Sequence, residues 1–348
     1  MSKENYMARC IELAQKGAGY VSPNPLVGAL IVKDGKVIGE GYHQKFGDAH
    51  AEINAINSLN DKELILGSEI YVTLEPCSHF GKTPPCSDRI IKENFSKVYV
   101  GSLDPNPLVA GKGIEKIRKA GIEVETGILE EECNWQNRFF RKHIVTNRPY
   151  VILKIAQSID GFVAKENQRT QITGIESQKA VHELRSQVDA VLVGKRTIEI
   201  DDPELTVRLV NGRNPKRVVL DKNSELNPGF KIFSHNPEST IIAKFSESPK
   251  NISNVSYINV LRNESRIDLR DLLVQLGKRF NSILVEAGPS LAESLLSENL
   301  VDELQLFISP LILKSGIPPF FQEKLLDGLK PKNGLSLGND FCLTYLKY

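Results

Sequence analysis

The stretch SEIYVTLEPCSHFGKTPPCSDRIIKEN, residues 68–94, decides the fold of the first part of the chain. It opens with β-branched and aromatic residues that predict a strand ending at Cys77. A proline-rich loop follows, and the residues from Cys86 onward have the pattern of a helix. A strand that runs through a loop into a helix is the building unit of an α/β sheet.

The segments on either side of this unit extend the same architecture. The expected strands are 26–32, 36–42, 97–104 and 122–127, and the expected helices are 3–17, 50–59 and 111–121. The Asp-Gly pair at residues 34–35 predicts a hairpin turn between the first two strands. Because this hairpin is followed by alternating helices and strands, we predict a three-layer α/β/α sandwich with a mixed sheet.

A second α/β region begins just after residue 148. Residues 128–148 have no clean strand pattern and predict a terminal helix followed by a linker near Val145–Arg148, so we expect domains at 1–146 and 147–348. The strands expected in the second domain are 149–164, 189–194, 217–221, 240–245, 255–260, 281–288 and 302–313, with helices that include 177–188 and 271–280.

The overall composition narrows the function classes. The 348 residues include 44 basic and 43 acidic side chains, a balance that argues against a nucleic-acid-binding protein. The N-terminal segment is amphipathic rather than apolar, and no stretch is long and apolar enough to span a membrane. Five cysteines in such a chain indicate reduced thiols or metal ligands. We therefore expect a cytoplasmic protein; a homo-oligomer is possible, but the oligomeric state cannot be read from the sequence.

One histidine and two cysteines in the first domain have the chemistry of a zinc site. His50, Cys77 and Cys86 supply three ligands, and a catalytic zinc keeps its fourth position open for water. Glu52 lies two residues from His50, which is the His-x-Glu spacing of zinc deaminases, followed there by Pro-Cys. The alternative is a structural zinc site in which His79 is the fourth ligand.

The second half of this motif departs from the usual Cys-x-x-Cys spacing. Eight residues separate Cys77 from Cys86, and Pro85 places Cys86 at the start of a helix, where free N–H groups stabilise a thiolate. The longer loop can therefore still bring Cys86 to the metal. The expected chemistry is attack of zinc-activated water on an amine-bearing ring carbon, with Glu52 carrying the proton to the leaving ammonia.

Four motifs together identify a family. SPNPLVGALIV, HAE, EPCSHFGKTPPC and DPNPLVAGKG resemble the deaminase half of the bifunctional riboflavin-biosynthesis deaminase-reductases. The resemblance implies a cytidine-deaminase-like domain and one phosphorylated pyrimidine substrate, 2,5-diamino-6-ribosylamino-4(3H)-pyrimidinone 5′-phosphate. It also implies substrate contacts at Asn24, His43, His79, Lys82 and Thr83.

The second domain lacks a G-x-G-x-x-G fingerprint, but three of its stretches extend the resemblance. VILKIAQSIDG, GKRTIEIDDPELTVR and VEAGPSLAESLL are similar to the reductase half, which has a dihydrofolate-reductase-like fold and reduces a ribosyl to a ribityl chain with NADPH. The implied catalytic residues are Lys154 and Glu286. The implied cofactor contacts are Ala156, Gln171, Thr197, Asp201, Gly288, Pro289, Ser290 and Leu291. The implied substrate contacts are Arg185, Leu205, Arg208 and Glu286.

One segment departs from the family pattern. RTQITG has Arg169 and Gln171 where the family often has serine and tryptophan, so an aromatic packing surface for the cofactor is missing at this position. The first alternative is accordingly an active deaminase whose second domain only holds substrate. The second alternative is an RNA-binding editing protein with a deaminase-like domain, against which the balanced charge speaks.

Overall fold

The chain divides into two compact units, Met1–Thr146 and Asn147–Tyr348. The structure is a computed structural model that describes residues 1–80, 84–107, 109–166, 168–234, 236–247, 252–320 and 326–347. Among these residues, no helix has both the length and the apolar character that crossing a membrane requires.

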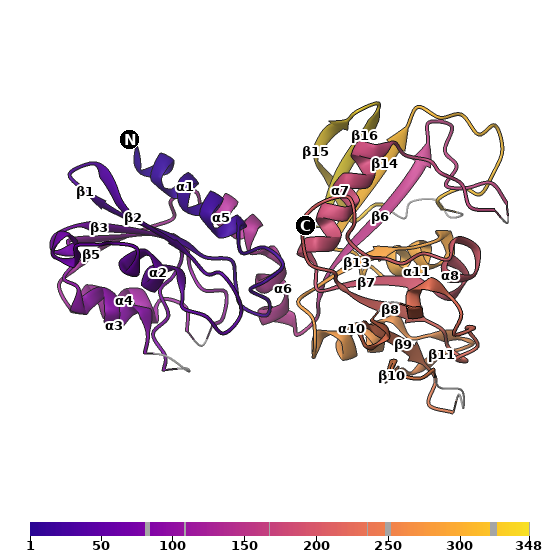
Figure 1. Cartoon of the computed structure of the whole chain (residues 1–348), viewed down its shortest axis with the longest axis horizontal. Helices are drawn as coiled ribbons and strands as arrows, with labels where there is room; N and C mark the ends of the chain where they lie inside the picture. Colours follow the sequence, from indigo (N-terminus) through magenta and orange to yellow (C-terminus); the bar gives the residue numbers. More distant parts are fainter. Residues whose placement is uncertain are drawn as a thin grey trace. The chain divides into compact units, whose positions relative to one another are not determined.

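The first unit is built on a five-stranded mixed sheet (Figure 1). Its strand order is β2 (Lys36–Tyr42), β1 (Gly28–Lys33), β3 (Glu69–Leu74), β4 (Lys97–Ser102), β5 (Glu123–Thr126). The β1–β2 and β1–β3 pairs are antiparallel, whereas β3–β4 and β4–β5 are parallel. The predicted hairpin and mixed sheet are therefore confirmed.

Helices cover both faces of this sheet (Figure 1). One face carries α1 (Lys3–Gln15) and α5 (Glu130–Gln136), and the other carries α2 (Ala51–Asn57), α3 (Cys86–Lys92) and α4 (Lys112–Lys119). The short helix η1 (Lys62–Ile65) precedes β3, and α6 (Arg138–Thr146) ends the unit. Successive strand residues point to opposite faces. Ile31 therefore packs in the apolar cluster under α2, whereas Leu30 packs in the cluster under α1.

Two glycines let helices lie close to the strands that position the site. A Cβ atom at Gly41 in β2 would lie 2.2 Å from the backbone nitrogen of Ala55 in α2. A Cβ atom at Gly28 in β1 would lie 2.0 Å from the carbonyl oxygen of Cys10 in α1. Any larger residue at Gly41 would push α2, and with it the helix start that carries His50, away from the sheet.

The second unit contains a nine-stranded sheet that is parallel over most of its width. Its strand order is β10 (Ser256–Asn259), β9 (Thr240–Lys244), β8 (Lys216–Leu220), β7 (Ala190–Gly194), β13 (Ser282–Glu286), β6 (Tyr150–Ser158), β14 (Glu303–Ser309), β16 (Asp340–Lys347), β15 (Leu329–Leu337). All pairs from β10 to β14 are parallel, and β16 and β15 add antiparallel strands at one edge.

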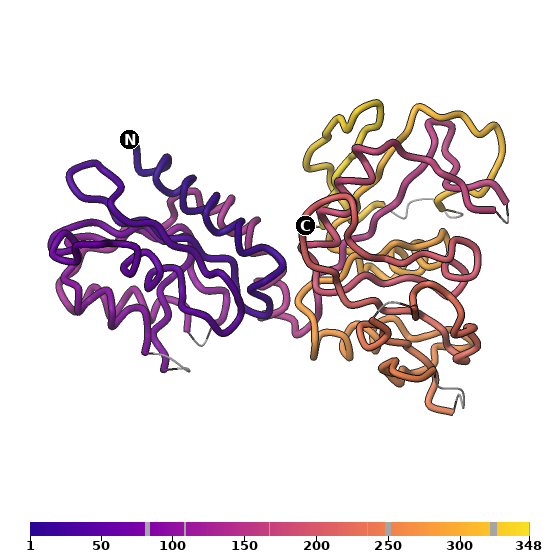
Figure 2. The backbone as a smooth tube through the Cα atoms, in the orientation of Figure 1, coloured from indigo at the N-terminus to yellow at the C-terminus, as the bar shows by residue number. Residues whose placement is uncertain are grey.

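The helices and smaller elements of this unit connect the parallel strands. They are α7 (Ile175–Gln187), α8 (Lys195–Asp201), α9 (Lys231–Ser234), α10 (Leu269–Gly277), α11 (Pro289–Ser297), η2 (Pro237–Ser239) and the two-residue strands β11 (Arg262–Asn263) and β12 (Arg266–Ile267). β6 and β13 are far apart in sequence but lie side by side (Figure 2), with Lys154 paired in register with Glu286. This register brings the two predicted catalytic residues together, with Glu286 as the last residue of β13 and Lys154 at the middle of β6.

The α/β class expected for both units is confirmed, with two local differences. The predicted linker near Val145–Arg148 begins inside α6, because that helix continues to Thr146. The final hairpin of β15 and β16 was not predicted. β15 is exposed along almost its whole length and contains Pro331 and Gly334, so it lacks the buried, β-branched pattern that marks a strand.

Candidate functional sites

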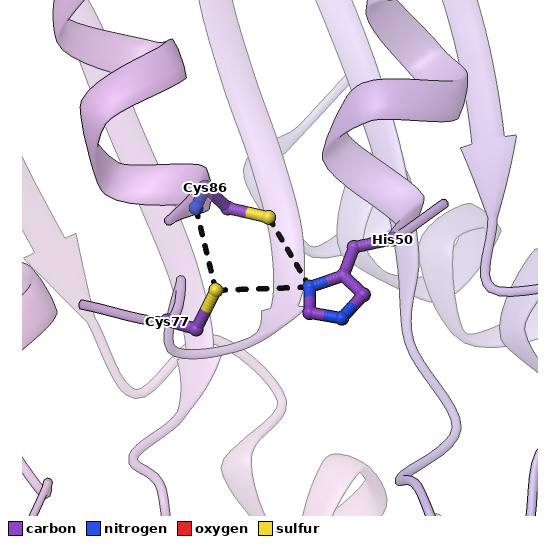
Figure 3. A group of neighbouring side chains, drawn as sticks. All are labelled: His50, Cys77 and Cys86. Atoms are coloured by element: carbon purple, nitrogen blue, oxygen red, sulfur yellow. Dashed lines mark hydrogen bonds between the residues drawn. The ribbon is translucent and has the colours of Figure 1, made fainter. Parts of the chain in front are cut away.

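A histidine and two cysteines converge in the first unit (Figure 3). The Nδ1 atom of His50 lies 3.3 Å from the Sγ atom of Cys86 and 3.7 Å from that of Cys77. The three atoms all lie within 4.8 Å of one another. Thiolate and imidazole are the ligands that zinc prefers, and three of them around one point leave a fourth position of a tetrahedron open. The donor set therefore fits the zinc ion that the sequence predicts.

Two of these three residues sit at the start of a helix, and the third lies in a loop three residues after a strand. His50 is the N-cap of α2, and Cys86 is the first residue of α3. Cys77 lies in the loop after β3, and its Sγ accepts a hydrogen bond of 3.3 Å from the backbone N–H of Cys86. A free N–H at a helix start is a partner for a thiolate rather than for a neutral thiol. The helix start of α3 thus stabilises the thiolate form of Cys77.

The pKa values of the two thiols depend on each other. The contact with Cys86 lowers the pKa of Cys77 to about 4, and the same contact together with burial raises the pKa of Cys86. The hydrogen bond to the Cys77 sulfur raises the pKa of His50. The lowered pKa of Cys77 favours a thiolate at this position, which is the form of cysteine that binds a cation.

Glu52 lies in the first turn of α2 and is almost completely buried. Burial, and next the negative charge of Cys77, raise its carboxyl pKa above the ordinary value. A carboxyl group with a raised pKa, held beside metal ligands, can take up and release a proton near neutral pH. The structure thus places Glu52 where the proton-carrying role predicted for it can be performed.

Two of the predicted substrate residues adjoin the metal cluster. The ring of His43 lies edge-on to that of His50, with 5.5 Å between ring centres. Nδ1 of His43 is 3.1 Å from the carbonyl oxygen of Ala49 and must donate to it, so Nε2 accepts from the side-chain amide of Asn24 at 3.1 Å. Burial lowers the pKa of His43, which keeps the ring neutral. Asn24 and His43 are therefore held as an oriented pair at the edge of the site.

The loop between the two cysteines carries the remaining predicted contacts. His79 is exposed and is not part of the metal cluster, so the structure does not support it as a fourth ligand. Lys82 and Thr83 lie outside the described residues. The predicted substrate contacts of these three residues stay predictions.

Glu75, which fixes the segment just before Cys77, was not predicted from the sequence. The buried carboxylate of Glu75 accepts hydrogen bonds of 2.9 Å from the backbone N–H groups of both Gly111 and Gly113. It also accepts from the N–H of Asp104 at 3.3 Å. Glu75 therefore ties the start of α4 to the segment that leads into Cys77. The Glu-Pro-Cys order was visible in the sequence, but the partners of Glu75 come from a distant loop.

The second unit contains a cavity of about 1360 Å³, lined by residues from β6, α7, α8, β13 and α11. It lies at the carboxyl ends of parallel strands, where open α/β sheets bind their ligands. The predicted site residues of this unit all line it: Lys154, Ala156, Gln171, Arg185, Thr197, Asp201, Leu205, Arg208, Glu286, Gly288, Pro289, Ser290 and Leu291. The structure thus brings them together, while their individual roles stay predictions.

A partly buried ion pair lines the cavity. The guanidinium of Arg185 donates from Nε and Nη2 to the two carboxylate oxygens of Glu286, at 2.6 and 2.8 Å. Burial opposes ionisation of Glu286, but the charge and hydrogen bonds of Arg185 outweigh it and lower the carboxyl pKa. Burial lowers the pKa of Lys154 on the neighbouring strand. An amine of reduced pKa beside a fixed carboxylate can exchange a proton with a bound ligand.

The start of α11 offers a place for a phosphate of a dinucleotide. Gly288 is the N-cap and has no side-chain capping bond, and a Cβ atom added there would meet nothing within 4 Å. The N–H groups of Ser290 and Leu291 belong to the first turn, whose backbone donors have no partner within the helix. Thr197 and Asp201 come from α8 on the same cavity, and burial raises the pKa of Asp201. The cavity therefore fits the predicted NADPH.

A turn after α8 supplies the predicted substrate residues. Leu205 is buried and has φ of 55°, a left-handed conformation that is uncommon for a branched side chain. The Arg208 side chain donates to Glu204 at 3.0 Å and also to Thr206. The backbone N–H of Arg208 donates to Nδ1 of His182 on α7 at 2.9 Å. His182 was missed by the sequence analysis, although its i, i+3 spacing to Arg185 placed both on one face of the predicted helix.

The segment that departs from the family pattern also lines the cavity. Arg169 and Gln171 are exposed side chains at its rim, and the side-chain amide of Gln171 donates to the carbonyl oxygen of Thr173 at 2.8 Å. The positive charge of Arg169 acts on Asp201 across the cavity. The replacement therefore changes the rim from aromatic to cationic without closing the cavity.

Two family models match the chain, one over each unit. The model described as the cytidine and deoxycytidylate deaminase zinc-binding region matches residues 1–102. The model described as the RibD C-terminal domain matches residues 149–343, more than half of the chain. The first match contains all three residues of the metal cluster, and the second contains the cavity described above.

Known proteins resemble the chain over its full length. It is 40% identical to the riboflavin biosynthesis protein RibD of Actinobacillus pleuropneumoniae, over 99% of this chain and 96% of that protein. It is 39% identical to RibD of Escherichia coli, over 99% of both chains. A solved structure from Thermotoga maritima, a diaminohydroxyphosphoribosylaminopyrimidine deaminase/5-amino-6-(5-phosphoribosylamino)uracil reductase, superposes with a TM-score of 0.90 at 38% identity, covering 99% of this chain and 98% of that one.

Proposed function

This chain belongs to the RibD family of riboflavin-biosynthesis proteins, and from that premise we propose that it catalyses two successive reactions on one small phosphorylated pyrimidine. It first deaminates 2,5-diamino-6-ribosylamino-4(3H)-pyrimidinone 5′-phosphate by hydrolysis. It then reduces the ribosyl group of the product to a ribityl chain with NADPH. The observation that carries the proposal is the His50, Cys77 and Cys86 cluster beside buried Glu52 in one unit, with a cofactor-sized cavity in the other.

The deamination is assigned to residues 1–146. A zinc ion held by His50, Cys77 and Cys86 would supply the Lewis acidity that activates water at neutral pH. Glu52 accepts the proton of that water and delivers it to the departing ammonia, for which its raised pKa and its position beside the cysteines are suited. Asn24 and His43 orient the pyrimidine next to the ligand His50.

The reduction is assigned to residues 147–348. NADPH bound in the cavity would supply a hydride to the carbon of the opened ribose. Lys154, whose pKa is lowered by burial, donates the proton that the new hydroxyl group requires. Glu286, held by Arg185, keeps Lys154 oriented and accepts hydrogen bonds from sugar hydroxyl groups. The remaining cavity residues position the cofactor and the substrate as the sequence analysis assigned them.

We place this activity in the cytoplasm, in keeping with the five cysteines, all of which are free thiols. The alternative of a second unit that only holds substrate is motivated by Arg169 and Gln171. It is weakened by the cavity, which contains both a helix start with free backbone N–H groups and a lysine in register with a carboxylate on the neighbouring strand.

A coupled assay tests the two halves together. The full chain, loaded with zinc, is given the diaminopyrimidinone substrate and NADPH while ammonia release and NADPH absorbance are followed. The expected result is ammonia release followed by NADPH oxidation in equal amount. Ammonia release with both NADPH and NADH unused would establish the alternative, and the absence of ammonia would overturn the assignment of the first unit.

A further inference from the structure

His182 is a buried histidine that none of the roles above includes. It lies on α7 three residues before Arg185, its side chain lines the cavity, and only 6% of its surface is exposed. A buried imidazole needs a partner for each ring nitrogen, because a buried polar atom without one is costly. The partners of the two nitrogens therefore decide what this residue can do.

The first ring nitrogen of His182 fixes the position of the proton. Nδ1 receives the backbone N–H of Arg208 at 2.9 Å and that of Leu209 at 3.5 Å. A nitrogen that accepts a hydrogen bond carries no proton, so the proton of the neutral ring must be on Nε2. Burial, and next the charges of Arg185 and Arg208, lower the pKa of His182 to about 4, so the ring is neutral at physiological pH.

The second ring nitrogen faces another donor instead of an acceptor. Nε2 of His182 lies 3.4 Å from Nη1 of Arg185. A guanidinium nitrogen can only donate, and Nε2 carries the proton, so no hydrogen bond joins this pair. Nη1 also donates to the carbonyl oxygen of Thr206 at 3.2 Å, while Glu286 takes Nε and Nη2. Within the described part of the chain, the Nε2–H group of His182 thus lacks an acceptor.

Two N–H donors that meet at the wall of a cavity suit an oxygen atom of a ligand. We propose that His182 is a substrate-binding residue of the reductase reaction, whose Nε2–H and the neighbouring Nη1–H of Arg185 together donate to one oxygen atom of the phosphorylated substrate. Its Nδ1 at the same time holds the Arg208 backbone in place. This proposal rests on the proposed function of the second unit. The competing source of such an oxygen is a phosphate of NADPH.

Two substitutions separate the nitrogens of His182. In His182→Asn the amide reaches the position of Nδ1, so it can hold the Arg208 backbone but has no donor at the position of Nε2. In His182→Gln the amide reaches the position of Nε2 and can donate there, but it does not replace Nδ1. The pair therefore distinguishes a donor to substrate from a purely structural contact.

The measurement is steady-state NADPH oxidation by the full chain with the deaminated pyrimidine as substrate. For His182→Asn we expect KM for this substrate to rise about tenfold, the effect of one lost hydrogen bond to a ligand oxygen. KM for NADPH and the rate of deamination are expected to be unchanged. For His182→Gln we expect KM for the substrate within about threefold of wild type, since one good donor is kept.

Two outcomes would overturn the proposal: a substrate KM near wild type in His182→Asn, with or without a loss in His182→Gln, and a rise in KM for NADPH alone. Absence of NADPH oxidation in the wild-type chain is a different failure, because it removes the proposed function of the unit. If neither variant folds, the ¹H–¹⁵N signal of His182 Nε2 in the wild-type chain decides. It is expected to shift on addition of the deaminated substrate, and a shift with NADPH alone, or none, counts against the proposal.

Discussion

The metal cluster of the first unit and the cavity of the second are assembled in opposite ways. The cluster uses three ligands between residues 50 and 86, two of them at helix starts and one in the loop after β3, with their ligand atoms within 4.8 Å of one another. The cavity collects single residues from strands and helices that are far apart in the sequence, and its volume is about 1360 Å³. A short motif can therefore specify the first site, whereas the second exists only once the whole sheet has formed.

The electrostatics of the two sites differ in the same way. The lowered pKa of Cys77 favours a thiolate in the cluster, and a bound cation would compensate its negative charge. Arg185 and Glu286 already neutralise each other through two hydrogen bonds. We expect the loss of one ligand to abolish deamination, and the loss of one cavity residue only to weaken the reduction. The four predictions that follow test this contrast.

Replacing one metal ligand should have the largest effect. Cys86→Ser removes a thiolate from a three-ligand set, so zinc is expected to be lost and deamination to fall about a thousandfold or more. NADPH oxidation with the deaminated substrate should stay near the wild-type rate. Zinc content by atomic emission and the two separate assays measure this. Cys10→Ala is the matched control, since Cys10 is a buried thiol outside the cluster, and zinc loss in that variant would contradict the ligand assignment.

Replacing the proton carrier should have the next largest effect. Glu52→Gln keeps the size of the side chain but cannot exchange the proton, so deamination is expected to fall by about 10²- to 10⁴-fold while zinc stays bound. A variant that still contains zinc but deaminates slowly separates the role of Glu52 from that of the metal ligands, and zinc content and the deamination rate measure this. A deamination rate near wild type in the zinc-loaded variant would show that another group carries the proton.

The difference between the sites also explains what the sequence could and could not reveal. His50, Glu52, Cys77 and Cys86 were identifiable because metal chemistry demands particular residue types at short spacing. Glu75 was missed because its acceptor role depends on backbone N–H groups of a loop far along the chain.

The second unit shows the same limit more strongly. Its parallel strands were predicted from their apolar runs, but the neighbours of each strand follow from sheet order, which periodicity does not encode. The helix pattern around His182 does not indicate that the backbone N–H of Arg208 donates to this side chain. The exposed strand β15 could likewise not be predicted from the sequence, because it is defined by its pairing with β16 and not by burial.

A conservative change in the ion pair should weaken the cavity without abolishing it. Arg185→Lys keeps the positive charge but cannot make the two parallel hydrogen bonds to Glu286, so kcat/KM for the reduction is expected to fall by about ten- to a hundredfold. Deamination should be unaffected. Arg208→Lys is the comparison variant, because the Arg208 side chain is exposed and its loss should change KM more than kcat. A wild-type kcat/KM in Arg185→Lys would mean that the fork geometry does not position Glu286.

Separating the two units should have the smallest effect of all. Every residue that lines the cavity lies between Lys154 and Ile317, and the main apolar core of the second unit is drawn from Val151 to Leu304. Residues 147–348 produced alone should therefore fold and oxidise NADPH with the deaminated substrate at a rate within about threefold of the full chain. Circular dichroism and the NADPH assay measure this. A folded fragment that binds NADPH but has lost its turnover would mean that the first unit contributes to the reductase reaction, and the two sites could then no longer be treated as independent.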